Sequence, residues 1–492
     1  MTTRSILNAL CAGVLLAGQF AGGQSTSSNS PLSNSMPTPR PFDPGTNTTN
    51  PSALAVQAQN PYLGSVPASP LVPGVLPLSL HEAVSRALRA NLGLIDSEQD
   101  HAQSRAARIR ALSVLLPQLS AEFSEAFADF PLTTIGGTKL GLPGITPAFN
   151  YQAAGLSYKQ NLLDISAIHE VKASRREEEM SAAALADSRN IVVLAATSAY
   201  LQVAASQSRV KAAEAEVESS QALDNLLKDR VKHEVSPEID SLRATVTRQN
   251  AEQRLALAQV RLEKDKLGLT RIVGLQLEQE FTLTDVLGFV PAPTESVEDL
   301  TAKATNQRDD LKAAAARVAY ARQLVSAESS KRLPTLAVQA NGGETGTNFG
   351  QVYNTYTVQG QMSFPIFTGR RIEADIASAR ATLHRREAEL EDLKQRTRYD
   401  VRSSLLDLKA ADKSVEIADT NLKLAQQGLT QAKDRFDAGV SNSLELIQAE
   451  QAVVSAKDNM IASIYGHNLA KLMLIRSTGT AENDYMLYLG VR

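Results

Sequence analysis

The sequence predicts an α+β protein built from two copies of one strand–helix unit. Two long stretches, residues 166–234 and 370–438, contain no proline and only one glycine, Gly428. Each therefore predicts one continuous helix of roughly 100 Å, at about 1.5 Å per residue. Alternating apolar and polar residues precede each stretch and predict strands. The order of elements repeats, and the last turn and helix of the two copies align without gaps at an offset of 205 residues, as Asp229 and Asp434 illustrate, which indicates a tandem duplication.

The N-terminus, residues 1–23, is typical of a secretory signal peptide. Arg4 gives a positive start, residues 6–20 are mostly apolar, and small residues follow. This run is shorter than the ~20 apolar residues of a membrane span, which counts against a transmembrane anchor. Cys11, the only cysteine, lies inside it, so we expect no disulfide and no thiol chemistry in the mature chain.

The remaining chain divides by composition and by the duplication. Residues 24–77 are rich in Pro, Ser, Asn and Thr and predict an extended or disordered N-terminal extension. Residues 78–280 form the first strand–helix repeat, residues 281–480 form the second, and residues 481–492 remain as a C-terminal tail.

Each repeat starts with helix and then turns to strand. Ser79 and Glu82 have the spacing of a capping box, and Pro117 ends the first helical stretch, as Pro334 does in the second repeat. Alternation then predicts four strands per chain, near 119–128, 151–163, 335–342 and 353–366.

The long helices carry a heptad pattern that predicts coiled-coil hairpins. Apolar residues recur at intervals of three and four before the second turn, at Val415, Ala418, Leu422, Ala425, Leu429, Ala432 and Phe436. The first repeat keeps this spacing but has Ser220 and Asp224 in the seam. Each hairpin bends back at one copy of the same turn, in residues 229–245 and 434–450.

Two architectures remain open from these patterns. One is a periplasmic coiled-coil scaffold or adaptor that does not cross a membrane. The other is a membrane protein, because Tyr356 and Val358 alternate with Thr357 and Gln359 as lipid-facing and lumen-facing residues of a barrel strand do. Four strands cannot enclose a wet lumen, and lipid does not tolerate open sheet edges. A barrel would therefore need several chains.

The chain resembles the TolC-type outer-membrane efflux proteins over roughly residues 78–479. The resemblance rests on LSLHEAVSRALRANLGL, the paired LLPQLS and RLPTLA, MSFPIFTGRR, and the turn RFDAGVSNSLELIQAE. It implies a homotrimer in which three chains contribute four strands each to one twelve-stranded outer-membrane β-barrel. The helices would continue as an α-barrel into the periplasm.

The resemblance also implies a function, a location and partners. Proteins of this family are passive exit ducts of tripartite efflux or type I secretion systems. Their partners are outer-membrane lipid, a periplasmic adaptor (membrane fusion) protein and an inner-membrane pump or secretion transporter. The residues do not separate drug efflux, metal efflux and protein secretion.

In this family the duplicated turns form a periplasmic tip that is held shut and gated. By that resemblance Glu445 carries the main acidic ring, while Gln448 stands where a second acid is common. We expect repulsion between copies of Glu445 to be opposed by packing of Phe436, Val440 and Leu444.

The same resemblance assigns a latch to Asp240. Its usual partners map to Phe436 and Ser441, which supply neither a phenol nor a guanidinium. The latch is therefore expected to be weaker, or to use Arg243 or Arg435.

Enzyme chemistry is not indicated. The six histidines are scattered, without metal-ligand spacing, and the sequence shows no nucleophile–base pair. We expect no cofactor and no metal. A formal net charge of −3 gives no bias toward nucleic acid.

Overall fold

A computed structural model describes residues 60–67, 70–129, 131, 133, 144–285, 288–293, 295–348 and 350–490. The expected signal peptide and the extension up to residue 59 lie outside the described residues. So do most of the residues between the first two strands.

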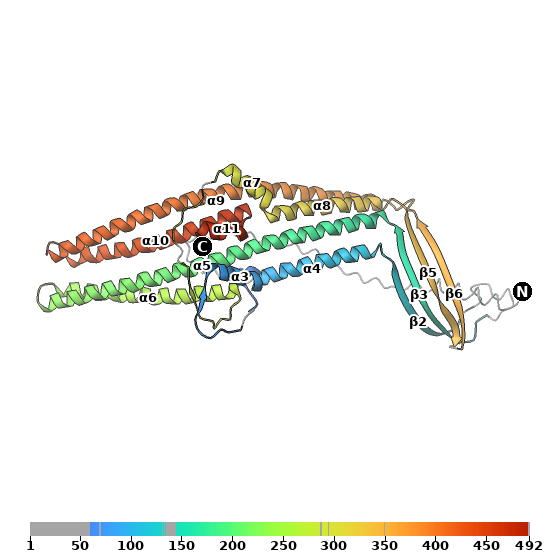
Figure 1. The fold of residues 1–492 in the computed structure, drawn as a ribbon, viewed down its shortest axis with the longest axis horizontal. Helices are drawn as coiled ribbons and strands as arrows, with labels where there is room; N and C mark the ends of the chain where they lie inside the picture. Colours follow the sequence, from blue (N-terminus) through green and yellow to red (C-terminus); the bar gives the residue numbers. More distant parts are fainter. Residues whose placement is uncertain are drawn as a thin grey trace. The chain divides into compact units, whose positions relative to one another are not determined.

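The first repeat has the predicted order of short helices, strands and a long hairpin (Figure 1). A 3-10 turn, η1 (Pro61–Leu63), precedes it. Its elements are β1 (Leu76–Leu78), α3 (Leu80–Ala90), α4 (Leu92–Ser113), β2 (Gln118–Ala128), β3 (Phe149–Leu163), α5 (Ile165–Lys232) and α6 (Glu238–Val273). The Ser79 hydroxyl accepts a hydrogen bond from the Glu82 amide at 3.2 Å, as the capping box predicts.

The second repeat runs through the same elements, which confirms the duplication. They are β4 (Phe281–Leu283), α7 (Val297–Gln307), α8 (Asp309–Ser330), β5 (Thr335–Asn348), β6 (Gln351–Ser363), α9 (Arg371–Asp437) and α10 (Ser443–Thr478). Both long helices are continuous within two residues of the predicted bounds. Gly428 does not interrupt α9, because one glycine costs a helix only about 1 kcal/mol.

The four predicted strands form one antiparallel sheet in the order β2-β3-β5-β6. β5 runs six residues past the predicted end at residue 342, where a glycine-rich stretch had indicated a loop. The glycines belong to the strand because neighbouring backbones approach closely. A Cβ on Gly343 would lie 2.2 Å from the carbonyl oxygen of Ala154.

One face of the sheet is apolar and open to the surroundings of the single chain. Leu119 on β2 pairs with Tyr158 on β3, which pairs with Ala340 on β5, which in turn pairs with Val358 on β6. Residues that pair in register point to the same face, so these four side chains share it. Phe123 and Tyr356 lie on it as well, and Tyr356 is 86% exposed. Described residues of this chain therefore leave the face uncovered.

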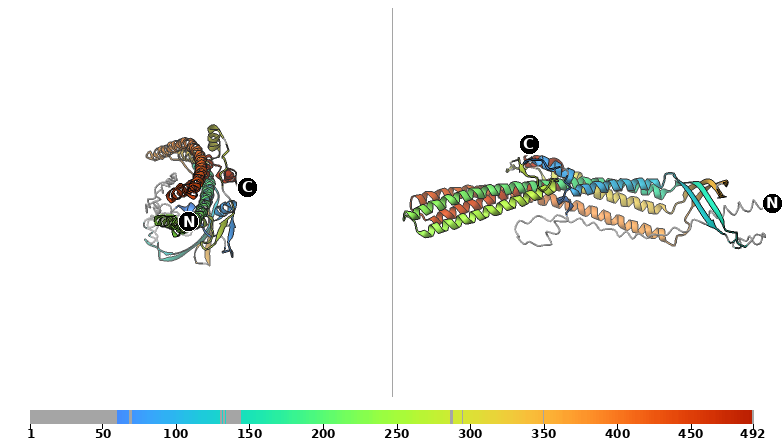
Figure 2. Two further views of the ribbon diagram at one scale, coloured as in Figure 1. Left: turned by 90° about the vertical axis from the view of Figure 1, so that its left-hand side faces the viewer. Right: turned by 90° about the horizontal axis from the view of Figure 1, so that it is seen from below.

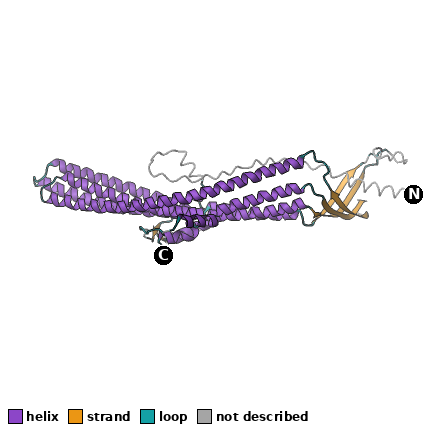
Figure 3. Cartoon of the chain, turned by 90° about the horizontal axis from the view of Figure 1, so that it is seen from above, coloured by secondary structure: helices purple, strands orange, loops and turns teal. Residues whose placement is uncertain are grey.

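All four helices that adjoin the sheet in sequence meet it at the same side, as Figure 3 shows. α4 and α8 lead into β2 and β5, and α5 and α9 leave β3 and β6. Beyond the short helices, α5 pairs with α6 and α9 pairs with α10 as two hairpins. α5 and α10 make the main contact between them (Figure 2).

The predicted heptad seam of α9 is the buried face of that helix. Val415, Ala418, Ala432 and Phe436 are buried, and the three residues between them are half-buried. The polar members of the first seam, Ser220 and Asp224, are buried too. The prediction of coiled-coil hairpins is confirmed.

The main hydrophobic core lies where the short elements cover the long helices. β1 and β4 pair in parallel there, with α3, α7 and α11 (Ala481–Leu489) around them. α11 falls in the segment expected to be a tail, yet Tyr485 and Tyr488 are each only 5% exposed. The tail sequence has no counterpart in the first repeat to align with, so duplication gave no sign of this helix.

The described end of the N-terminal extension packs on its own chain instead of standing free. The Tyr62 hydroxyl lies 3.0 Å from the Ser188 hydroxyl on α5, and the Asn91 side chain donates to the Tyr62 carbonyl at 2.8 Å. Helix α5 also has an 18-residue window apolar enough for a membrane span, but half of that window is buried against neighbouring elements. A core helix meets the same criterion.

Candidate functional site: the hairpin tips

The two hairpins end in one backbone turn written twice. Each helix stops at a left-handed residue, Glu234 with φ 61° and Gly439 with φ 73°. In the first turn the Val235 amide donates to the Arg230 carbonyl at 2.8 Å, and the equivalent bond in the second turn is 3.0 Å. This pattern satisfies carbonyls at the helix end that would otherwise lack partners. The repeated motif therefore encodes a repeated C-terminal cap.

The two predicted gate acids occupy equivalent positions in the repeats. Asp240 and Glu445 are 205 residues apart and lie in the first turns of α6 and α10. The Arg243 guanidinium lies 3.5 Å from the Asp240 carboxylate, and the Arg435 guanidinium lies 3.2 Å from the Glu445 carboxylate. Both predicted arginines thus face a predicted acid. Each pair stays within one hairpin.

Phe436 is brought into a small apolar cluster between the hairpins and is 4% exposed. The cluster's buried residues are Leu223, Leu227, Ala244, Ala432, Phe436, Leu446 and Ile447. Val440 and Leu444, which we expected to pack with it at the closed tip, are 68% and 40% exposed in the single chain, so their packing in an assembly stays a prediction. They follow the left-handed turn and the helix N-cap, which direct them outward.

Ser441 and Gln448 take no part in the ion pairs of the tip. The Ser441 hydroxyl oxygen is buried and has no hydrogen-bond partner among the described residues. Gln448 is exposed on α10. Among the described residues no hydrogen bond joins either residue to Asp240.

One arginine crosses from the first hairpin to the second. The Arg230 guanidinium carbon lies 4.2 Å from the centre of the Phe436 ring, and its Nη2 lies 3.5 Å from Asp437 Oδ1. The sequence pattern did not indicate this contact, because nothing in a heptad links residues about two hundred positions apart.

A buried carboxylate stabilises the first hairpin at a seam position. Asp224 is fully buried and accepts hydrogen bonds from Lys228 Nζ at 2.7 Å, Thr245 Oγ1 at 2.8 Å and Arg248 Nε at 3.0 Å. Burial alone would raise the pKa of Asp224, but these three donors hold it below the ordinary value. The seam of α5 therefore contains a satisfied ionic cluster where that of α9 is apolar.

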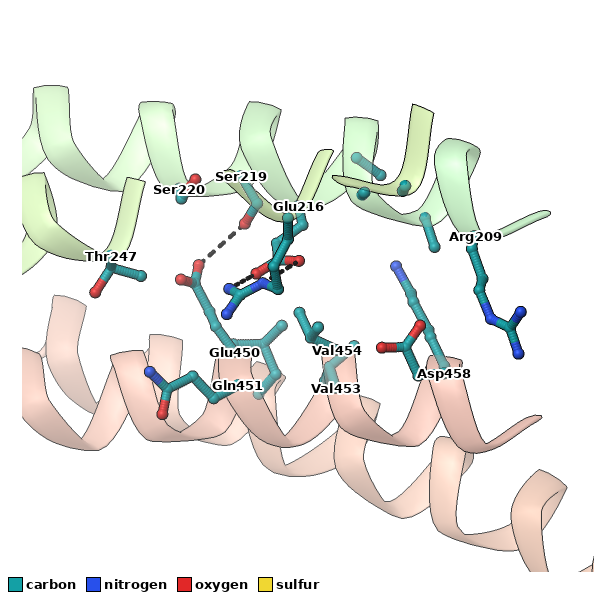
Figure 4. A pocket seen from close by; sticks show the side chains of 17 residues that line it. Arg209, Glu216, Ser219, Ser220, Thr247, Glu450, Gln451, Val453, Val454 and Asp458 are labelled. Atoms are coloured by element: carbon teal, nitrogen blue, oxygen red, sulfur yellow. Dashed lines mark hydrogen bonds and ion pairs between the residues drawn. The ribbon is translucent and has the colours of Figure 1, made fainter. Parts of the chain in front are cut away.

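A cavity of about 270 Å³ lies between the hairpins, lined by residues of α5, α6, α9 and α10 (Figure 4). Glu450 points across it and accepts a hydrogen bond from the Ser219 hydroxyl at 3.0 Å. Burial raises the pKa of this carboxyl group. Glu216 pairs with Arg254 on the same wall. The cavity is therefore lined by acidic and basic side chains. Glu450 and Glu216 both have a partner within the chain, Ser219 and Arg254 respectively.

Two sets of ion pairs lie near the main core: the first is within the second repeat, and the second joins the two repeats. The Arg308 guanidinium lies 3.1 Å from the Asp400 carboxylate on α9 and donates to the Ser477 carbonyl on α10 at 3.4 Å. Beside it the Arg476 guanidinium lies 2.7 Å from the carboxylate of Asp187 on α5. Burial raises the pKa of Asp187. These contacts hold α9 and α10 in place near the main core, at the side of the hairpins away from the tips.

A buried lysine fixes the C-terminal helix. Lys471 is fully buried, and its ammonium donates to the Tyr488 carbonyl at 2.9 Å, at the C-terminal end of α11. Burial lowers the pKa of Lys471 to about 8. His467 lies beside it with Nε2 2.7 Å from Asp412 Oδ1. No group of three or more metal-ligating side chains occurs among the described residues.

Comparison with known proteins places this architecture. Residues 300–480 match a family model described as outer membrane efflux protein. The pyoverdine export outer membrane protein OpmQ of Pseudomonas putida is 22% identical over 289 residues, which cover 57% of this chain and 60% of OpmQ. Outer membrane protein TolC of Vibrio cholerae is 22% identical over 342 residues, covering 68% of this chain and 78% of TolC.

Solved channels share the fold across most of their length. The CmeC outer membrane channel of Campylobacter jejuni superposes with a TM-score of 0.73 at 16% identity, covering 86% of this chain and 92% of CmeC. VceC of Vibrio cholerae gives 0.70 at 17% identity, covering 81% and 96%. With the duplicated hairpins and the four-stranded sheet, these matches show that the chain has the fold of these outer-membrane channels and that residues 300–480 resemble the outer membrane efflux protein family.

Proposed function

We propose that three copies of this chain form a passive exit channel across the outer membrane, with its helices extending into the periplasm. The observation that carries the proposal is the sheet β2-β3-β5-β6. Its outer strands β2 and β6 have no further partner among the described residues, and its apolar face is exposed. Unpaired edges and an apolar face favour a barrel shared between chains in lipid. They count against a scaffold that stays in water.

The helices favour the same assembly. α5 and α10 make most of the contact between hairpins, which leaves α6 and α9 each with a face that no described element covers. Both free faces carry exposed apolar residues, namely Ile239, Leu242, Val246, Leu257, Val260 and Leu267 on α6, and Tyr399, Leu406, Ile417 and Leu424 on α9. Docking α6 of one copy on α9 of the next is a head-to-tail contact, and such contacts generate a ring when the rotation between copies closes after three.

We propose that the hairpin tips form the gate. Asp240 and Glu445 are equivalent in the two repeats, so a trimer would carry six such carboxylates around its tip. Arg243 and Arg435 offset part of this charge. The remaining negative potential would favour cations where water is restricted.

The partners proposed are those of the family. A periplasmic adaptor would dock on the hairpin end, and an inner-membrane pump or a secretion transporter would supply cargo. Relatives of this chain include a pyoverdine export protein and the proteases secretion protein PrtF of Dickeya chrysanthemi. A wide passive duct contacts cargo little, and both small molecules and proteins fit this function.

The test is single-channel recording in planar bilayers with protein extracted from outer-membrane fractions. We expect cation-selective channels of low resting conductance. Glu445→Gln should lower the cation preference, and Asp240→Ala should raise resting conductance, whereas the surface change Gln426→Ala, three turns before the end of α9, should alter neither. Protein that fractionates with the periplasm and gives no channels would refute the proposal.

A further inference from the structure

The contacts of the tip differ in whether they join the two hairpins. Asp240 pairs with Arg243 three residues on in the same helix, and Glu445 pairs with Arg435 across the turn of its own hairpin. Opening the space between hairpins would break neither pair. A latch must join groups that separate on opening, so these pairs brace each turn without holding the hairpins together.

Arg230 does join them. It leaves the last turn of α5, lies over the ring of Phe436 and reaches the Asp437 carboxylate at the end of α9. The ring is buried, and the arginine side chain is 26% exposed. A guanidinium can stack on an aromatic face and donate to a carboxylate in its plane at the same time, which an ammonium cannot do.

The duplication shows that this bridge runs in one direction only. Arg435 is the repeat equivalent of Arg230, but the positions equivalent to Phe436 and Asp437 are Val231 and Lys232. The first hairpin thus offers Arg435 neither a ring nor an acid, and Arg435 turns back to its own hairpin instead. Among the described residues each chain therefore has one such bridge.

We propose that Arg230 is the latch that holds the two hairpins of each chain together at the closed tip. Arg230 is then a positioning residue of the gate, and this proposal rests on the proposed function as a channel. Asp240 then contributes charge and bracing, and its removal opens the tip less than removal of Arg230.

The test compares Arg230→Ala, Arg230→Lys, Asp437→Asn and the double variant Arg230→Ala/Asp437→Asn by single-channel recording. Loss of a partly exposed stack and ion pair corresponds to roughly a five- to tenfold shift of the closed–open equilibrium in each chain. We expect Arg230→Ala to raise open occupancy by that factor. Asp437→Asn should raise it less, and the double variant should match Arg230→Ala.

Two comparisons separate a latch from a general structural role. Arg230→Lys keeps the ion pair alone, so it should close the tip at low salt and behave like Arg230→Ala at 1 M salt, where the Debye length is about 3 Å. The matched control is Arg176→Ala, which removes an ion pair with Glu179 on the same helix away from the tip. It should leave open occupancy unchanged.

Hydrogen exchange at the end of α9 gives a second readout that needs no channel. It should speed up in Arg230→Ala and not in Arg176→Ala. If the wild type forms normal channels and Arg230→Ala has the same open occupancy and the same hydrogen exchange as the wild type, the latch proposal is wrong and the channel function stands. Asp240→Ala opening the tip more than Arg230→Ala would also overturn the latch. If the wild type forms no channel, the proposed function is wrong. The hydrogen-exchange result would then still show whether Arg230 holds the end of α9 to the first hairpin.

Discussion

The buried carboxylate of Asp224 gives the sharpest prediction about the hairpins. Replacing it by alanine removes three hydrogen bonds, to Lys228, Thr245 and Arg248, and leaves the last two donors facing the seam. Breaking a buried, hydrogen-bonded charge pair costs about 3 kcal/mol or more. Because Lys228 is half exposed, we take the lower end of that range.

About 3 kcal/mol is a factor of roughly 150 in an equilibrium constant. Unfolding of membrane trimers is often irreversible, so local opening is the better measure. We expect Asp224→Ala to speed hydrogen exchange of amides in α5 and α6 near the tip by about a hundredfold. Exchange in α9 and α10 should change much less.

The second repeat supplies the control. Leu429 and Val453 occupy the positions equivalent to Asp224 and Arg248. Asp224→Leu/Arg248→Val gives the first seam the apolar pair of the second, and such replacements are often neutral or stabilising. Its exchange should stay within about threefold of wild type. A double variant as unstable as Asp224→Ala, or an Asp224→Ala protein that exchanges like wild type, would refute the reasoning.

The same cluster gives a pH dependence with a defined sign. The pKa of Asp224 is lowered in the folded chain, below roughly 3.9 in the unfolded chain. Its contribution is therefore fully present above about pH 4 and is lost as pH falls through the folded pKa. Wild-type hairpin exchange, corrected for intrinsic rates, should rise below that pH, and the double variant should lack this rise.

Three further predictions concern single positions. Glu234→Gly should stabilise its turn by about 0.5–1 kcal/mol, because it relieves a left-handed residue, and Gly439→Glu should destabilise the other turn by a similar amount; exchange at each turn measures both. Gly274→Ala should lower folding yield and melting temperature, at a cost of about 3 kcal/mol, since its Cβ would lie 2.3 Å from a buried alanine methyl, while Gly268→Ala, with open space around it, should not. Lys471 has a folded pKa of about 8 and an unfolded value near 10.4, so the unfolded chain binds more protons between these values and stability should rise from pH 8 to pH 10. Lys471→Met should remove that rise in melting temperature.

Local and repeated patterns account for the features that sequence predicted well. Heptad spacing gave the buried seam from Val415 to Phe436, and alternation gave four strands. The duplicated turn reflects one cap, with Glu234 and Gly439 in the same backbone conformation. Each of these depends on residues close in sequence or related by a fixed offset.

Features that depend on distant residues were not predictable in the same way. In the sequence Asp224 is only a polar residue that interrupts an apolar seam. Its partners Thr245 and Arg248 come from the returning helix α6, so the heptad pattern does not indicate them. The crossing from Arg230 to Phe436 needs the packing of two hairpins to be known. By composition the glycines of β5 predict a loop, because their role in the close approach of neighbouring backbones leaves no periodic signature in the sequence.

In the proposed trimer, three chains share one barrel that closes by pairing of strand β2 of one chain with strand β6 of the next. Cysteine cross-linking in outer membranes tests it, because Cys11 is the only native cysteine and lies in the expected signal peptide. Ser120→Cys on β2 is combined in turn with cysteine at Thr355, Thr357, Gln359 or Gln361 on β6, all on the face opposite the apolar one. We predict that at least one combination gives cross-linked dimers and trimers and nothing larger. No cross-link in any combination, or a ladder that continues past three chains, would contradict the account.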